Sequence, residues 1–384
     1  MPGTRLLEHA LRDRFAATKP ARSPADLTIA FEHEFFLNSG ERPASLEDSQ
    51  ALLLRVADTL KWRARHESDA VLGDYVSSIA PTSRHWPALK YEHPPHLLEI
   101  ALAPATSVDA LGAPLAELLG AIERAATEIG LSVLHEPFAR YPATEALLWR
   151  SDAYRAELRR YRERWLRARG IAPRPDLINF SAVLAATQIH VGGLDAINNP
   201  AVVERLYTCE PPILWYAFLN TSSALPIGDR VRARHGTYHA ALPDCPLLGF
   251  PDLPAWTVAA WADALSRMPQ LGEQREQDPH QIIDHARDLQ IVRPRTFGSI
   301  EFRADPAQRD ANALLGLAAL RMGCAAHALG RPHVARSWLE ARAAWWQAVD
   351  SGHVVRDVAL LEQVREGLDS RGFDEARYLH VFEV

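Results

Sequence analysis

The sequence has few cysteines, few lysines and no long hydrophobic run. Three cysteines among 384 residues, with no C-x-x-C pair, argue against a disulfide scaffold and a thiolate zinc site, and indicate a reducing compartment. The longest apolar stretch, from Ala311 to Leu320, stops at Arg321, whereas a bilayer span needs about 20 residues. Charged residues interrupt the apolar pattern at the start of the chain, unlike a signal peptide. We therefore expect a cytoplasmic protein with no membrane partner.

Lysine occurs only at Lys19, Lys61 and Lys90, although the chain has 42 basic residues. A GC-rich genome is the ordinary explanation of such a bias. It leaves anion binding mostly to arginine, which pairs with carboxylate and phosphate through two parallel hydrogen bonds. The formal net charge of −6 argues against a nucleic-acid binder that works by bulk charge. Small molecules are the expected partners.

Several common catalytic motifs are missing from the sequence. It contains no GxxxxGK[ST] phosphate loop, no GxGxxG, no GxSxG and no HExxH. These absences argue against the nucleotide-binding, hydrolase and zinc-protease classes that those motifs mark. A nucleotide enzyme without such a loop, and almost without lysines, must bind phosphate through metal ions and arginine.

The pattern of the chain predicts one large α+β domain over residues 1–384. Strand-like segments alternate polar with apolar residues and follow no regular βαβ rhythm, which favours an antiparallel sheet with one polar face. The expected strands are 27–37, 97–102, 178–191 and 298–305. The expected helices are a lead-in within 1–22, then 46–64, 108–129, 151–169 with Ser151 as its N-cap, and a C-terminal helical part over 307–384, in which Trp338, Trp345 and Trp346 are expected in the core. Two proline-rich connectors are expected at 209–212 and 243–254.

Segment 27–37 carries a pair of carboxylates on one side. Residues two apart in a strand share a face, so Glu32 and Glu34 lie together, about 6–7 Å apart. The opposite face is apolar except for His33, which we interpret as a buried structural histidine. A solvated sheet face is the ordinary interpretation of such a pair, and repetition of the pattern in other strands argues against it.

The other expected strands repeat this pattern of one polar and one apolar face. Gln188 and His190 share a face, Glu301 and Arg303 share another, and Glu99 faces away from its apolar neighbours. Glu92 precedes Glu99 by seven residues, an odd offset that requires a turn or bulge between them. If the strands form one sheet, its polar face carries Glu32, Glu34, Glu92, Glu99, Glu301 and His190.

Five carboxylates on one face repel one another unless cations neutralise them. Oxygen ligands with one imidazole suit Mg²⁺ or Mn²⁺ better than structural zinc. Two divalent ions nearly cancel the five charges, and Arg303 then lies where an anion held by the metals would be. The alternative is that the strands lie in different sheets and each acid is an ordinary surface residue.

Four segments, FEHEFFL, HLLEIALAP, ATQIHVGG and GSIEFRADP, occur in this order over residues 29 to 306. Together they resemble the glutamate–cysteine ligase family and its carboxylate–amine ligase relatives. The resemblance implies a glutamine-synthetase-like fold: a curved antiparallel sheet with the active site on its concave polar face and helices on the other face. It also implies a ligase that uses ATP to join the γ-carboxylate of glutamate to an amine through an acyl phosphate. Cysteine is the first acceptor to test.

The resemblance also implies roles for the matched residues. Glu32, His190 and Glu301 would hold the metal ion that bridges the ATP phosphates. A second ion, nearer the acceptor carboxylate, would be held by Glu34, Glu92 and Glu99. Arg303 would stabilise the transferring phosphoryl group, and Glu301 and Arg303 count as catalytic. The expected contacts to substrate or ATP are Arg303, Arg295, Arg293 and Gln188.

Other functions stay open at this point. The same chemistry with a different acid or amine describes a biosynthetic ligase, and a guanidino kinase would stop at phosphoryl transfer. A non-catalytic descendant would bind metal or nucleotide without turnover. A dinuclear metallohydrolase is weakened because the HxH and additional His and Asp ligands that it usually needs are not evident.

Overall fold

The computed structural model describes residues 3–15, 19–70, 72–84, 88–92, 94–143, 153–267, 283, 290–295, 298–330 and 336–383. The strands are β1 (Thr28–Ser39), β2 (Arg42–Pro43), β3 (Arg63–Asp69), β4 (Gly73–Ala80), β5 (Leu89–Tyr91), β6 (Leu97–Ala101), β7 (Ser132–Leu134), β8 (Thr187–Gly192), β9 (Val292–Pro294) and β10 (Ser299–Phe302). The α-helices are α1 (Thr4–Phe15), α2 (Leu46–Leu60), α3 (Asp109–Glu128), α4 (Ala153–Ala168), α5 (Pro175–Ile178), α6 (Pro200–Leu219), α7 (Ile227–Ala241), α8 (Val258–Arg267), α10 (Ala311–Gly330), α11 (Trp338–Ser351) and α12 (Val358–Asp369). Short 3₁₀ helices are η1 (Pro24–Asp26), η3 (Phe180–Val183) and η4 (Ala376–Phe382).

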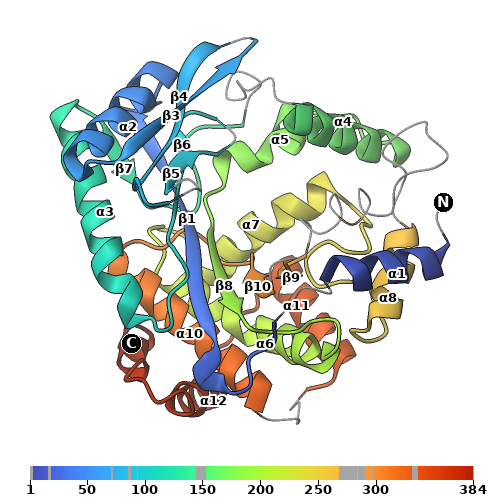
Figure 1. Ribbon diagram of the computed structural model, residues 1–384. Helices are drawn as coiled ribbons and strands as arrows, with labels where there is room; N and C mark the ends of the chain where they lie inside the picture. The colour runs from blue at the N-terminus through green and yellow to red at the C-terminus, as the bar shows by residue number, and fades with distance from the viewer. Residues whose placement is uncertain are drawn as a thin grey trace.

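All ten strands belong to one antiparallel sheet. Its order is β3-β4-β5-β6-β1-β8-β10-β9, with β2 and β7 also paired to β1. Strand β1 runs through the middle of the molecule and is hydrogen-bonded on both sides (Figure 1). The α+β class and the antiparallel sheet predicted from the alternating pattern are therefore confirmed.

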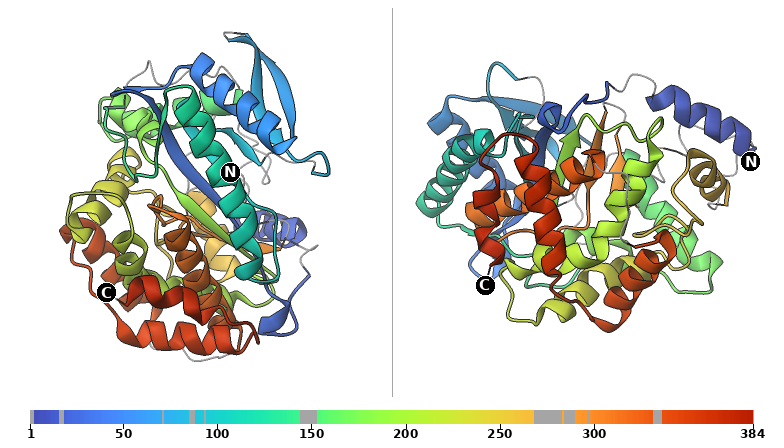
Figure 2. Two further views of the ribbon diagram at one scale, coloured as in Figure 1. Left: turned by 90° about the vertical axis from the view of Figure 1, so that its left-hand side faces the viewer. Right: turned by 90° about the horizontal axis from the view of Figure 1, so that it is seen from below.

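One face of the sheet packs into the main hydrophobic core. Ile29, Phe31 and Phe35 alternate along β1 and are completely buried, and each such side chain contributes about 1.5–3 kcal/mol by leaving water. Helices α2, α3 and α10 pack on this side, with α3 crossing beside β1 in Figure 2. This arrangement positions the other face of β1, with Glu32 and Glu34, toward the interior of a cavity.

His33 lies on the core side of β1, as the alternation predicts. It is completely buried, its Nδ1 lies 2.9 Å from Thr187 Oγ1, and its Nε2 lies 3.0 Å from His135 Nδ1. Burial lowers the pKa of His33 well below its ordinary value, so the ring is neutral. The prediction that His33 is buried is confirmed, and its structural role stays a prediction.

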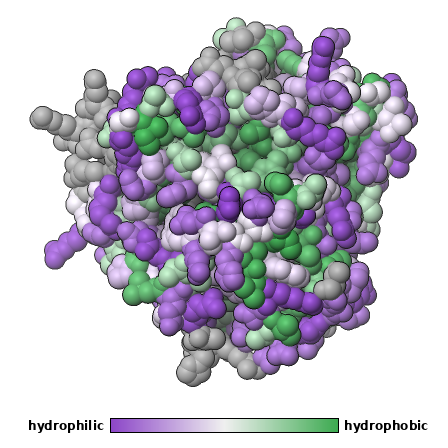
Figure 3. All heavy atoms as spheres, turned by 180° about the vertical axis from the view of Figure 1, so that it is seen from behind, coloured by the Kyte–Doolittle hydropathy of each residue, from purple (hydrophilic) through white to green (hydrophobic). Residues whose placement is uncertain are grey.

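Helices also border the polar face, beyond those expected behind the sheet. Side chains from α4, η3, α7 and α11 line a cavity together with the acidic residues of β1 and β6. The cavity therefore lies between the polar face of the sheet and these helices. On the outside, hydrophilic and hydrophobic residues are interspersed over the face opposite to that of Figure 1 (Figure 3).

The connector expected at 209–212 is wrong, because these residues lie inside helix α6. Pro211 and Pro212 lack the N–H groups that a helix interior uses, at a cost of about 3 kcal/mol or more. Their neighbours Tyr207, Ile213 and Leu214 are almost completely buried. Tertiary packing of an apolar helix therefore overrides the local signal of two prolines. The second segment, 243–254, lies outside the named helices and strands, as expected.

The strand expected over 178–191 is only half correct. Ile178 is the last residue of α5, residues 180–183 form η3, and β8 begins only at Thr187. A continuous apolar run does not distinguish a strand from a buried turn, because it has no period. The helix expected over 46–64 ends at Leu60, where Lys61 adopts a left-handed conformation with φ 55°. The expected N-cap Ser151 lies outside the described residues.

Helix α10 extends beyond the apolar stretch seen in the sequence. Its 20 residues are long and apolar enough to cross a membrane by length and composition, but 83% of its apolar stretch of 18 residues is buried inside the fold. Arg321 is completely buried in its middle and pairs with Glu210 and Asp305. These features are those of a core helix that fixes a buried charge, and they are weak evidence for a membrane span.

Candidate active site

The register of the sheet places the predicted residues on one face. Glu34 lies opposite Glu99, and Glu32 lies opposite Gln188. Glu301 lies opposite His190 on one side and opposite Arg293 on the other. The four strands that carry the sequence motifs are therefore neighbours in the order β6-β1-β8-β10, as the single-sheet interpretation requires.

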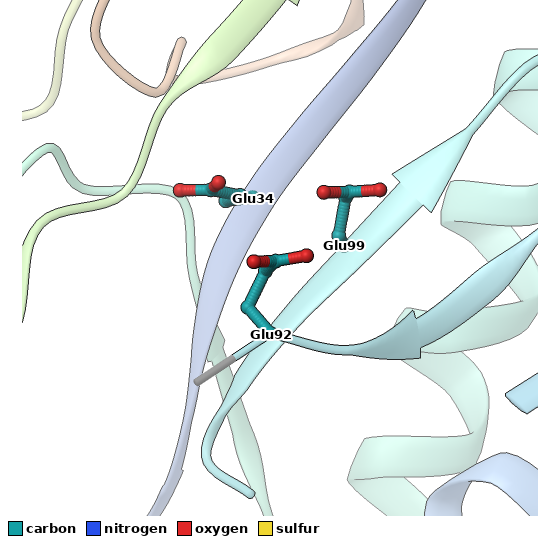
Figure 4. A group of neighbouring side chains, drawn as sticks. All are labelled: Glu34, Glu92 and Glu99. Carbon is teal, nitrogen blue, oxygen red and sulfur yellow. The ribbon is translucent and has the colours of Figure 1, made fainter. Parts of the chain in front are cut away.

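Three carboxylates converge at one end of this face. Each of Glu34, Glu92 and Glu99 offers an oxygen, and these oxygens lie within 4.8 Å of one another (Figure 4). Among the residues that the structure describes, they are the one such group of three. Glu99 is 2% exposed, and its Oε1 has one charged neighbour, the Lys90 ammonium group 3.0 Å away. This buried set of oxygen donors fits a hard divalent cation.

The crowding of these acids changes their protonation. Burial and the neighbouring Glu92 carboxylate raise the pKa of Glu34 to about 8. Burial and the nearby Glu32 carboxylate raise the pKa of Glu99 well above its ordinary value. A cation among them would return both groups to the charged form, because it removes the repulsion that opposes ionisation.

The sequence interpretation missed Lys90, which lies among these carboxylates. Its Nζ is 2.8 Å from Glu92 Oε1 and 3.0 Å from Glu99 Oε1. Strand β5 places Lys90 directly opposite Glu99 on β6. The signal that could have revealed it is its spacing of two residues from Glu92, which puts both on one face of a strand.

The second predicted metal set is brought only partly together. His190 Nε2 lies 3.8 Å from Glu32 Oε1, too far for a hydrogen bond, and has no hydrogen-bond partner among the described residues. This pair fits a cation between its atoms. Glu301, the third member of this set, instead forms ion pairs with three arginines. Its place in a metal site therefore stays a prediction.

Three arginines surround the completely buried Glu301. Arg295 Nη1 lies 2.7 Å from Glu301 Oε2, Arg293 Nη1 lies 3.3 Å from the same oxygen, and Arg303 pairs with Oε1. Because of these cations, the pKa of Glu301 is well below its ordinary value although burial opposes the shift. Three positive charges around one carboxylate leave an excess that suits a polyanion.

Gln188 connects the arginine cluster to the acidic group. Arg303 Nη1 donates to Gln188 Oε1 at 3.1 Å, and Gln188 Nε2 donates to Glu34 Oε1 at 3.2 Å. The backbone N–H of Ala186 also donates to Glu34 Oε2 at 2.7 Å. These contacts hold Glu34 and Arg303 in a fixed relation across strands β1, β8 and β10.

The acidic group and the arginine cluster face one cavity of about 370 Å³. Helix α7 contributes Arg234, His235 and Tyr238 to its wall, and α11 contributes Trp345 and Trp346. Trp338 and Trp345 are almost completely buried, as predicted. The prediction that Trp346 is a core residue is correct only in part, because it packs against the main core but is only partly buried and also lines the cavity.

The cavity wall also carries polar atoms without partners among the described residues. Within the described part of the chain, Tyr161 Oη, Trp346 Nε1 and both amide atoms of Gln290 make no hydrogen bond. A buried polar atom without a partner costs about 1–3 kcal/mol. This wall therefore suits an uncharged group that offers hydrogen-bond donors and acceptors.

No family model and no curated protein sequence matches the chain. Solved structures do. A bifunctional glutathione synthetase from Pasteurella multocida aligns with 98% of this chain at 11% identity and a TM-score of 0.53. A glutamate–cysteine ligase from Francisella tularensis in complex with AMP covers 95% of this chain and 82% of its own at 10% identity, with a TM-score of 0.46. The Pup ligase PafA, solved with Pup, covers 94% of this chain and 63% of its own at 10% identity and a TM-score of 0.42.

The chain spans about half of the Pasteurella multocida structure, 49% of its length. At this identity the likeness concerns the fold, and the chain shares the fold of that part of the synthetase. The resemblance to carboxylate–amine ligases inferred from the four sequence motifs is thus confirmed at the level of the fold.

Proposed function

We propose that the protein is an ATP-dependent ligase that joins a carboxylic acid to an amine. The observation that carries this proposal is the placement of two opposite charge clusters around one cavity. Glu34, Glu92 and Glu99 form one cluster, and the arginines around Glu301 form the other. An acid that must be activated by phosphate transfer needs both a site for cations and a site for phosphate oxygens.

The chemistry explains why the cavity needs these groups. A free carboxylate is a poor electrophile, so its oxygen must first become part of an acyl phosphate, which the amine then attacks. Divalent cations, when bound, neutralise charge on the phosphoryl group. The chain itself contributes position: Arg303, held by Gln188, meets the transferring group, while Arg293 and Arg295 hold the anion in line.

The aromatic wall supports ATP as the phosphate donor. Trp346 and Tyr238 offer ring surfaces, and Gln290 offers both a donor and an acceptor. A purine base presents the complementary combination of a flat apolar surface and a hydrogen-bonding edge. ATP and Mg²⁺, or Mn²⁺, are accordingly the proposed cofactors.

The finer assignment is a glutamate–cysteine ligase type of reaction, acting on the γ-carboxylate of glutamate in the cytoplasm. It is supported by the order of the four motifs and by the fold. The same support serves a ligase of another acid or amine, which is the nearest alternative.

Incubation of the protein with ATP, Mg²⁺, glutamate and a panel of amines tests the proposal, with ADP release and product mass as readouts. We expect ADP release that depends on glutamate and an amide product with the preferred amine. Glutamate-dependent release that ignores cysteine would favour the alternative ligase. A stable phosphoguanidine would assign a guanidino kinase, and ATP binding without turnover would overturn the enzyme proposal. A Glu34→Gln/Glu99→Gln variant is the matched inactive control.

A further inference from the structure

The acidic group contains a cation that belongs to the chain itself. Lys90 Nζ donates a hydrogen bond to Glu92 Oε1 at 2.8 Å and lies 3.0 Å from Glu99 Oε1. The side chain is 34% exposed, whereas that of Glu99 is 2% exposed. The ammonium group therefore reaches from the cavity to one partly buried carboxylate, Glu92, and one buried carboxylate, Glu99.

The sheet fixes the origin of this side chain. Strand β5 lies between β4 and β6, and Lys90 pairs with Ser78 on one side and Glu99 on the other. Pairing on both sides prevents the backbone from moving away, so Lys90 faces the carboxylates in every state that keeps the sheet intact. Its four-carbon stem is flexible, so the charged end can still withdraw toward the cavity.

A divalent ion in this group would need the space that the ammonium occupies. Mg²⁺ binds carboxylate oxygens at about 2.0–2.1 Å, and Mn²⁺ accepts the same octahedral set of oxygen ligands. An ion bound to Glu92 Oε1 and Glu99 Oε1 would therefore lie between the two oxygens that Lys90 Nζ now contacts. The divalent ion and the Lys90 ammonium group cannot both occupy this position, and they would repel each other if they lay side by side.

The charge count points in the same direction. Glu34, Glu92 and Glu99 carry three negative charges when ionised, and Lys90 cancels one of them. Lysine is a compact point charge with three donors, whereas the planar fork of arginine suits two parallel oxygens. It is therefore the basic side chain that can replace an ion among three separate carboxylates.

We propose that Lys90 is a built-in competitor for the divalent cation at Glu34, Glu92 and Glu99. Its ammonium holds the site when no ion is present, and the ion enters by displacing it. The ion thus binds more weakly here than the three carboxylates alone would allow. The inference rests on the proposed function only in taking this group as a divalent-cation site.

Titration with Mn²⁺ tests the competition directly. Free Mn²⁺ is measured by electron paramagnetic resonance at pH 7.5, with no nucleotide or substrate present. We expect Lys90→Met to bind one Mn²⁺ more tightly than the parent by about tenfold or more, because a like charge a few ångströms away is removed. Lys61→Met is the matched control, since Lys61 is an exposed lysine paired with Asp58, and its binding curve should equal that of the parent.

A second substitution locates the gain. Lys90→Met combined with Glu99→Gln should lose the tighter binding, because one ligand of the site is gone. Tighter binding that survives in this double variant, or a Lys90→Met curve identical to the parent, would overturn the proposal. If Lys90→Met fails to fold, Lys90→Gln provides the same comparison, with thermal melts as the folding check. Failure of the ligase proposal would appear separately, as absent ADP release in the substrate assay.

Discussion

At the scale of single residues, Arg303 joins the two charge clusters. It pairs with Glu301 and donates to Gln188 at 3.1 Å, so its guanidinium points into the cavity from a fixed position. We expect Arg303→Ala to lower kcat by about a hundredfold while the KM for the acid changes little, because the contact forms mainly with the transferring phosphoryl group. Steady-state kinetics under saturating ATP measure both constants. Arg309→Ala, an exposed arginine paired with Asp310, is the matched control. A rise in KM alone would show that Arg303 binds the ground state.

Glu301 and Glu99 should respond oppositely to loss of their charge. Glu301 is buried among three arginines, so Glu301→Gln leaves excess positive charge without its counterion and should lower the free energy of unfolding by about 3 kcal/mol. Glu99 is crowded by other acids, so Glu99→Gln relieves repulsion and should leave the stability unchanged or raise it when a chelator is present. Urea unfolding in EDTA measures both. Equal destabilisation by the two variants would contradict this assignment of charges.

At the scale of elements, strict alternation made β1, β6 and β10 predictable. In each of these strands one face is polar and the other apolar, and an alternation with a period of two residues is typical of a strand. The β3–β4 hairpin, Arg63–Ala80, was missed because β3 has mostly polar side chains and so no apolar face to mark it. Pro211 and Pro212 misled for the opposite reason: their local signal is strong, and the packing of α6 that overrides it involves distant segments.

Helices α10 and α12 approach closely enough to require glycine. A Cβ on Gly323 would lie 2.6 Å from both Val364 Cγ1 and Val364 O. Gly323→Ala should therefore destabilise the protein by about 1–3 kcal/mol through overpacking. Gly330→Ala at the end of the same helix is the control, since nothing lies within 4 Å of its added methyl group. Chemical denaturation compares the two, and equal effects would show that the helices separate without cost.

At the scale of the whole molecule, buried histidines should make the fold sensitive to acid. Burial lowers the pKa of His96 to about 4 and that of His235 to about 3, from 6.5. Above pH 6.5 both rings are neutral in the folded and unfolded chains, so these two histidines do not lower the free energy of unfolding there. As the pH falls from 6.5 toward 4, the unfolded chain binds protons at these histidines and the folded chain does not. The free energy of unfolding therefore decreases.

The substitution His235→Phe tests this pH dependence. It should remove about 3 kcal/mol of the loss in stability between pH 7 and pH 4. Its neighbours Phe218 and Trp345 already pack edge-on against the ring, so phenylalanine fits the site. Urea unfolding at several pH values gives the slope, and the exposed His9→Phe is the control. A slope equal to that of the parent would show that His235 is protonated in the fold.

The candidate site was predictable only as far as strand faces are. Glu32, Glu34, Glu99, His190 and Glu301 follow from alternation and from the order of the motifs. Lys90 follows only in part: its spacing puts it on the same face as Glu92, but its contact with Glu99 depends on the pairing of β5 with β6. The place of Trp346 in the cavity wall depends on how α11 packs against the rest of the fold. The pairing of Glu301 with Arg293 and Arg295 was likewise not predictable, since register across β9 and β10 is a property of the folded sheet.

Strand β1 has neighbours along both edges, and its twelve residues serve two purposes in alternation. Deletion or insertion of one residue in β1 before Glu32 would exchange the two faces of the strand. The side chains of the present core face, such as Phe31 and Phe35, would then project into the cavity. The carboxylates of Glu32 and Glu34 would enter the hydrophobic core. Homologues should therefore differ in β1 by substitutions at constant length, with insertions and deletions confined to segments outside the strand.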